Sequence, residues 1–129
     1  MQHEYLEERV IRPQDQATLA INEFLARCGL TRDPAVEYTT ALYYQNRIIA
    51  AGSLAGANLC GIAVDPDFRG KGLSAKVVGN LINEAGRRGQ FRCFVEAAPQ
   101  VEEQFLSLGF SKIACPESTC TVLAVVFEP

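Results

Sequence analysis

Hydrophobic positions along the chain follow two different spacings, one typical of strands and one typical of helices. Short apolar or alternating runs predict seven strands, at residues 5–11, 36–44, 48–54, 59–64, 91–95, 110–114 and 121–127. Apolar residues that recur every three to four positions predict three helices, at residues 14–28, 73–88 and 99–108. A glycine follows each helix, at the position where a left-handed C-terminal cap is expected.

The order of these elements predicts an α+β fold, in which one mixed but mostly antiparallel sheet of six to seven strands is flanked by three to four helices. Strands 59–64 and 91–95 are separated by a long helix, so we expect them to be a parallel pair at the centre of the sheet. A chain of 129 residues is long enough for one hydrophobic core, and we expect residues 1–129 to form a single domain.

Charge and composition exclude several classes of function. The 12 basic and 15 acidic residues give a net charge of −3, which disfavours a broad surface for nucleic acid or anionic membrane. No apolar run approaches the roughly 18 residues of a membrane span, and the N-terminus does not resemble a signal peptide. The five cysteines contain no CxxC pair, so we interpret them as buried, reduced thiols rather than disulfides. We expect a cytoplasmic protein without a metal site.

The residues with the most specific chemistry lie between the strand at 59–64 and the helix that begins at residue 73. Gly70 and Gly72 let the backbone approach a ligand closely, and Arg69 and Lys71 add positive charge. The first N–H groups of the helix then point at the same place. A Gly-x-Gly pair alone is a weak signal, but between a strand and an amphipathic helix it is more specific. It predicts a phosphate or pyrophosphate site, with a purely structural turn as the alternative.

Residues 64–74 also resemble the acetyl-CoA signature of the GNAT acetyltransferase superfamily, whose loop has the pattern Arg/Gln-x-x-Gly-x-Gly/Ala. Arg69 and Gly72 match this pattern, and Ser74 stands at the final small position. Residues 105–110 resemble the Tyr-x-x-Leu-Gly-Phe segment of the same superfamily. The resemblance implies the GNAT fold, an acetyltransferase function and acetyl-CoA or CoA as the cofactor.

The resemblance further implies a cofactor site in two parts. The loop N–H groups would hold the pyrophosphate of CoA, at residues Arg69, Gly70, Lys71, Gly72, Leu73 and Ser74. Strand 59–64 would diverge from strand 91–95, and the pantetheine arm would lie along the backbone of Ile62, Ala63 and Val64. For these three side chains, packing in the core is the alternative.

Acetyl transfer to an amine needs a base, because an amine with a pKa near 10.4 is almost entirely protonated at neutral pH. The candidate bases are Glu37, Glu96 and Glu117. We favour Glu96 because it ends the strand that would face the acyl group. A solvated carboxylate at the end of a strand is the alternative.

In the superfamily, the tyrosine of the Tyr-x-x-Leu-Gly-Phe segment usually protonates the leaving thiolate. Phe105 occupies this position, and a phenyl ring has no proton to donate. Cys93 and Cys120 are candidate replacements, with packing in the core as the alternative for each. The sequence therefore predicts that binding is better preserved than catalysis.

Four segments, at residues 52–56, 60–64, 70–74 and 108–110, resemble the N-terminal acetyltransferase-like domain of the citrate lyase ligases. This resemblance implies a role in acetylating the thiol of a CoA-like prosthetic arm, with the acyl-carrier subunit of citrate lyase as partner, in a reaction that consumes ATP and acetate. The adenylating domain of that family carries a His-x-Gly-His motif, and His3 is the single histidine of this chain.

Three interpretations follow from the sequence. The chain is the N-terminal domain of a longer ligase, a free-standing N-acetyltransferase that transfers acetyl from acetyl-CoA to an amine, or a non-catalytic interaction domain.

Overall fold

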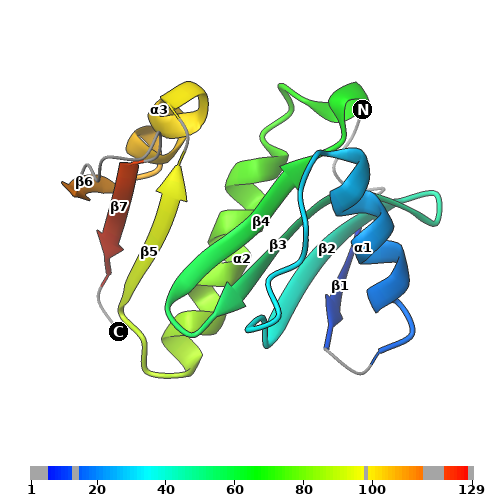
Figure 1. Ribbon diagram of the computed structural model, residues 1–129, viewed down its shortest axis with the longest axis horizontal. Coiled ribbons are helices and arrows are strands. Elements are labelled where there is room, and N and C mark those ends of the chain that lie inside the picture. The colour runs from blue at the N-terminus through cyan, green and yellow to red at the C-terminus, as the bar shows by residue number, and fades with distance from the viewer. Residues whose placement is uncertain (1–5, 13–14, 98, 115–120, 128–129) are drawn as a thin grey trace.

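The structure is a computed structural model that describes residues 6–12, 15–97, 99–114 and 121–127, and it contains one mixed sheet flanked by helices (Figure 1). The strands are β1 (Glu7–Ile11), β2 (Tyr38–Tyr44), β3 (Arg47–Ala55), β4 (Asn58–Val64), β5 (Arg92–Ala97), β6 (Ser111–Ala114) and β7 (Thr121–Val126). The helices are α1 (Thr18–Arg27), α2 (Leu73–Arg87) and α3 (Pro99–Ser107), and a short 3₁₀ helix, η2 (Pro66–Phe68), precedes α2.

The sheet has the order β1-β2-β3-β4-β5-β7-β6. Every neighbouring pair is antiparallel except β4 and β5, which are parallel as predicted. The predicted α+β fold class is therefore confirmed. The largest difference in element bounds is at α1, which begins four residues later than predicted. A turn precedes it, in which the Asp15 carboxylate accepts a hydrogen bond of 2.8 Å from the backbone N–H of Arg12.

The parallel pair is short, and this feature creates the central opening of the fold. Only Asn58 and Leu59 of β4 are in register with β5, opposite Phe94 and Val95. Beyond these two positions the strands diverge, and Figure 1 shows them separating toward the end of β4 that leads into η2. The rest of β4 is held on its other side by β3.

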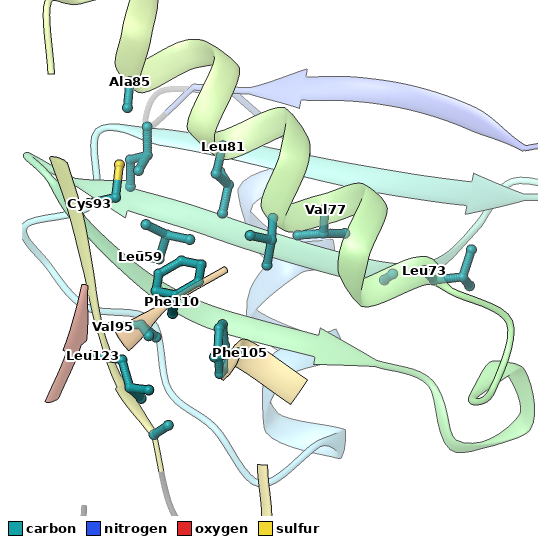
Figure 2. Close-up of a cluster of buried hydrophobic side chains, with 14 of the residues drawn as sticks. Leu59, Leu73, Val77, Leu81, Ala85, Cys93, Val95, Phe105, Phe110 and Leu123 are labelled. Atoms are coloured by element: carbon teal, nitrogen blue, oxygen red, sulfur yellow. The ribbon is translucent and has the colours of Figure 1, made fainter. Parts of the chain in front are cut away.

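Two hydrophobic clusters hold the helices on opposite faces of the sheet. The larger cluster packs α2 and α3 against one face and continues across both β4 and β5 (Figure 2). Its labelled members in that view are Leu59, Leu73, Val77, Leu81, Ala85, Cys93, Val95, Phe105, Phe110 and Leu123. The smaller cluster packs α1 against the other face, mainly through Ile21, Phe24 and Leu25. The core under the β4–β5 junction therefore joins the two halves of the sheet.

The close contact between α2 and β3 depends on the absence of a Cβ atom at Gly52. A Cβ atom there would lie 2.5 Å from Cγ1 of Val77 and 3.0 Å from Cδ1 of Leu81. We expect Gly52→Ala to lower the free energy of unfolding by about 1–3 kcal/mol, because α2 must move outward. Urea denaturation followed by circular dichroism measures this change.

Gly79 supplies the matched control, because it lies within α2 and a Cβ atom there would meet nothing within 4 Å. Gly79→Ala should raise the free energy of unfolding by about 0.5–1 kcal/mol, since alanine loses less backbone freedom in a helix. Equal effects at the two positions would contradict the described packing of α2 on β3.

Candidate functional site

A cleft of about 1790 Å³ occupies the space where β4 and β5 diverge. Its walls are formed by β4, the loop that leads into α2, the Phe94–Glu96 part of β5, and α3. Residues of the segment 28–35, which follows α1, line the cleft as well. Known ligand pockets enclose about 300–1,000 Å³, so this cleft has room for a large ligand and a second molecule.

The β4 wall is irregular at Gly61. The β3–β4 register shifts between Ala51 and Ser53, and Gly61 lies in the shifted stretch with a φ of +61°. A glycine at a positive φ is typical of a β-bulge, which bends the strand and frees backbone groups from the ladder. Ile62, Ala63 and Val64 follow the bulge, and all three line the cleft. Their side chains also pack in the two hydrophobic clusters, so each of them serves both the core and the cleft wall.

The glycine loop contributes Arg69, Gly70 and Gly72 to the lining of the cleft. Gly70 and Gly72 have φ values of +78° and +76°, and a Cβ atom at either position would meet nothing within 4 Å. Open space above two left-handed glycines permits a close approach of a ligand to the backbone. The N–H of Lys76 donates the first hydrogen bond of α2, to the carbonyl oxygen of Gly72. The N–H groups of residues 73–75 come before it, as do the first N–H groups of any helix, and take no part in the helical hydrogen bonds. No acidic residue lies in this first turn of α2.

The loop side chains differ in their positions. Arg69 lines the cleft and donates a hydrogen bond of 3.3 Å from Nε to the carbonyl oxygen of Val64. Leu73 and Ser74 also line the cleft, with the Leu73 side chain buried in the larger cluster. Lys71 is exposed and is not among the residues that line the cleft. The arrangement presents backbone N–H groups and one guanidinium to an anion.

A buried carboxylate fixes the entry into this loop. Asp65 accepts a hydrogen bond of 2.9 Å from the backbone N–H of Asp67 and one of 2.5 Å from Arg47. The hydrogen bond from Arg47 holds the pKa of the Asp65 carboxyl below its ordinary value, although burial opposes this shift. The Arg47 guanidinium also lies 5.7 Å from the ring centroid of Phe68, which lines the cleft. Asp65 and Arg47 thus position η2 and the loop that follows it.

Of the three candidate bases, the structure places Glu96 at the cleft. Glu96 is exposed on β5 and lines the cleft next to Val95. Glu37 is engaged elsewhere, since it accepts a hydrogen bond of 2.9 Å from the N–H of Gly56 and pairs with Arg88 at 3.3 Å. Glu117 lies outside the described residues.

The position of the usual acid is occupied by a buried aromatic pair. Phe105 lines the cleft, is 7% exposed, and makes an edge contact with Phe110 at a centroid distance of 5.4 Å. Cys93 is not a replacement acid, because it is fully buried in the larger cluster and does not line the cleft. Burial raises the pKa of the Cys93 thiol. Cys120 lies outside the described residues.

Sequence reasoning missed the wall that the segment 28–35 and Cys60 provide. Cys28, Leu30, Asp33 and Ala35 line the cleft together with Cys60. Nothing in the spacing of these residues signals this contact, because it depends on how α1 packs across the sheet. The bulge, in contrast, has a signal in the sequence, since a glycine inside an apolar strand often marks one.

The described residues contain no group of three or more His, Cys, Asp or Glu side chains arranged to hold a metal ion. Among them, no helix combines the length and the apolar composition that crossing a bilayer requires.

The sheet order, the divergent parallel pair and the glycine loop define an acetyltransferase-type fold, and solved structures agree. An acyl-CoA N-acyltransferase from Pseudomonas aeruginosa superposes with a TM-score of 0.79 at 10% identity, covering 94% of this chain and 99% of that chain. An N-acetylglutamate synthase from Neisseria gonorrhoeae, complexed with coenzyme A and N-acetyl-glutamate, superposes with a TM-score of 0.72 at 16% identity. That match covers 95% of this chain and 36% of the synthase.

The chain belongs to the GNAT acetyltransferase family, because the model of the acetyltransferase (GNAT) domain matches residues 9–123. It is also similar to [citrate [pro-3S]-lyase] ligases. The Klebsiella pneumoniae ligase is 34% identical over 95 residues, which are 74% of this chain and 28% of that protein. The Escherichia coli ligase is 30% identical over 105 residues, which are 81% of this chain and 30% of that protein. The chain thus spans less than a third of the length of these relatives.

Proposed function

We propose that the cleft between β4 and β5 binds CoA or acetyl-CoA, with the pyrophosphate on the loop from Arg69 to Ser74. The observation that carries this proposal is the pair of left-handed glycines, which have open space above them and stand before an unblocked helix N-terminus. The pantetheine arm then lies along Ile62, Ala63 and Val64, where β4 has diverged from β5. The coenzyme A in the structurally similar synthase supports this assignment.

In the wider reaction, we propose that residues 1–129 act as a single cytoplasmic CoA-binding domain resembling the N-terminal part of a citrate lyase ligase. Its ligand there is the CoA-like prosthetic arm of the citrate lyase acyl-carrier subunit. The similarity to two ligases over most of this chain supports this role. Phe105 at the cleft supports a role in binding, since the described residues that line the cleft include no tyrosine to protonate a leaving thiolate.

A second candidate is a complete N-acetyltransferase that acts on an amine. The position of Glu96 favours it, because an exposed carboxylate at the cleft can accept a proton from an ammonium group. This candidate predicts release of CoA from acetyl-CoA that depends on an added amine, and Glu96→Gln should slow that release. Unchanged release in the variant would remove Glu96 as the base.

Isothermal titration calorimetry tests the binding proposal directly. We expect CoA and dephospho-CoA to bind with dissociation constants below about 1 mM at moderate salt, and pantetheine, which lacks the diphosphate, to bind at least tenfold more weakly, a difference of about 1.4 kcal/mol. The expected order follows from the diphosphate contacts of the glycine loop. The absence of both heat and thermal shift with millimolar CoA would overturn the proposal and favour a non-catalytic interaction domain.

A further inference from the structure

The second half of the sheet, formed by β5, β7 and β6, has one face that no described helix covers (Figure 1). Helix α1 packs on this side of the sheet, but its cluster takes in residues of β1 to β4 and none of the described residues of the second half. On the opposite side, Cys93 and Val95 of β5 pack in the larger cluster. Because side chains alternate along a strand, Arg92, Phe94 and Glu96 point to the uncovered side.

The middle of this uncovered face is apolar. Leu123 of β7 packs in the larger cluster, and Lys112 of β6 pairs with Glu102 of α3, so the neighbours of both residues point to the uncovered side. Large apolar side chains are well exposed there, with Ile113 at 56% and Val126 at 67%. Contiguous apolar patches that are rimmed by polar residues mark binding sites. Besides Arg92 and Glu96, the face carries Phe94 on β5, Val122, Ala124 and Val126 on β7, and Ser111 and Ile113 on β6.

A hollow of about 460 Å³ on this face adjoins the large cleft. Phe94 and Ile113 line both the cleft and the hollow. Glu96 lines the cleft alone, and Arg92 lines the hollow alone. We call the surface that runs along β5 from Glu96 past Phe94 to Arg92 the trough. A ligand with one end in the cleft can therefore continue along the trough.

Opposite charges stand at the two ends of the trough. Arg92 and Glu96 are both exposed, and neither pairs with another described residue. They are four positions apart on β5, and a strand rises about 3.3 Å per residue, so their Cα atoms lie about 13 Å apart. The trough is therefore negative at the cleft, apolar in the middle and positive at its far end.

This order of charges is complementary to a short extended peptide. An extended chain advances about 3.3 Å per residue, so the amino group and the terminal carboxylate of a tetrapeptide lie about 13 Å apart. A small amine would reach Glu96 but leave the apolar middle and Arg92 uncovered. Helix α1 rises from the same side of the sheet, over the first half, which favours a narrow ligand over a broad, flat partner (Figure 1).

We propose that the trough binds the N-terminal segment of a peptide in an extended conformation. The amino group lies at Glu96, apolar side chains lie against Phe94 and Ile113, and a carboxylate at about the fourth residue pairs with Arg92. The inference deepens the second candidate function and rests on it for the role of the peptide as acyl acceptor.

In that role, Glu96 accepts one proton from the ammonium group and passes it to water. The nitrogen then attacks the acetyl carbonyl carbon, a C–N bond forms and the C–S bond of acetyl-CoA breaks. The second proton leaves the nitrogen, and the thiolate takes up a proton through water. The products are the acetylated peptide and CoA.

Nitrogen-15 NMR of the backbone amides tests the trough without relying on turnover. We expect the peptide Ala-Val-Ala-Val to shift the cross-peaks of Phe94, Ile113 and Ala124 saturably. Its C-terminal amide and its N-acetyl form should each bind about threefold more weakly, because an exposed ion pair contributes modestly. The absence of shifts at these three positions at tens of millimolar peptide would overturn the proposal.

Peptide length tests the spacing of the two charges. The dipeptide Ala-Val is too short to reach from Glu96 to Arg92, so its free acid and its amide should bind equally. If amidation weakened the dipeptide and the tetrapeptide by the same factor, the assignment of the carboxylate to Arg92 would be wrong.

Substitution of Arg92 tests the same contact from the side of the protein. Arg92→Gln should lose the preference for free-acid Ala-Val-Ala-Val over its amide, and Arg92→Glu should prefer amidated Ala-Val-Ala-Lys. The control is Arg87→Gln, since Arg87 is 72% exposed at the end of α2 and this variant should keep the preference of the parent. A preference for the free acid that persists in Arg92→Gln would contradict the proposal.

The calorimetric titration with CoA keeps the two proposals distinguishable. If CoA fails to bind while the tetrapeptide shifts the three cross-peaks, the proposed function fails and the peptide site stands. If CoA binds while the tetrapeptide causes no shift, the peptide site fails alone. If both bind but mass spectrometry finds no acetylated peptide after incubation with acetyl-CoA, the role as acyl acceptor is overturned.

Discussion

Gly72→Asp is expected to weaken CoA binding by at least about 30-fold, close to 2 kcal/mol in binding free energy. Gly72 has a φ of +76° and open space where a side chain would project, so a carboxylate would enter the volume we assign to the pyrophosphate. It would also bring a negative charge to the N-terminus of α2, where an anionic ligand is expected to bind. Calorimetry with CoA measures the loss, and the free energy of unfolding is measured in parallel.

Gly89→Asp is the matched control for this substitution. Gly89 has a φ of +79°, also meets nothing within 4 Å, and follows the other end of the same helix. Both variants impose a left-handed conformation on an L-residue, which costs about 1–2 kcal/mol of stability. If both variants lose the same stability but only Gly89→Asp still binds CoA, backbone strain does not explain the loss of CoA binding in Gly72→Asp. Unchanged CoA binding in Gly72→Asp would remove the glycine loop as the pyrophosphate site.

Phe105→Tyr is expected to raise amine-dependent acetyl transfer by about 100-fold, at the lower end of what a general acid contributes. Phe105 already lines the cleft, so a hydroxyl added to its ring can reach a leaving thiolate. A tyrosine with an ordinary pKa near 10 keeps its proton at neutral pH. Release of CoA from acetyl-CoA with a panel of small amines, followed with a thiol reagent, measures the rate.

Phe110→Tyr controls for this gain, because Phe110 belongs to the same aromatic pair but does not line the cleft. Its hydroxyl would be buried, so this variant should lose stability by about 1–3 kcal/mol and gain no activity. The affinity for acetyl-CoA should stay within about twofold in Phe105→Tyr, since a proton donor acts on the transition state. Equal rates in the two variants and the parent would show that the missing hydroxyl does not limit transfer.

The sheet and the glycine loop could be predicted from the sequence because their signals are local. The apolar run of β4, the amphipathic pattern of α2 and the glycine after it predict from the sequence alone that β4 and β5 are parallel, as the structure shows. The loop between them follows from residue types at fixed spacing. The predicted position of Glu96 at the end of β5 also places it at the cleft, since β5 is one wall of the opening.

The part of the cleft wall that the segment 28–35 forms could not be predicted from the sequence, because it depends on tertiary packing. The segment 28–35 follows α1, and nothing in its composition states which part of the sheet α1 covers. Glu37 illustrates the same limit, since its contacts with Gly56 and Arg88 join three connecting segments that are far apart in the sequence.

The short β4–β5 pairing has a consequence for how the domain opens. Two register pairs and the larger hydrophobic cluster join the half-sheet formed by strands β1–β4 to the half-sheet formed by β5, β7 and β6. Helix α2 packs on the first half and α3 on the second. Cooperative unfolding units often coincide with such substructures. Because the backbone pairing between the halves is limited to two register pairs, we expect opening of the second half to cost less free energy than global unfolding. A ligand bound between the two strands would stabilise the closed arrangement, because its binding free energy would add to the free-energy cost of that partial opening.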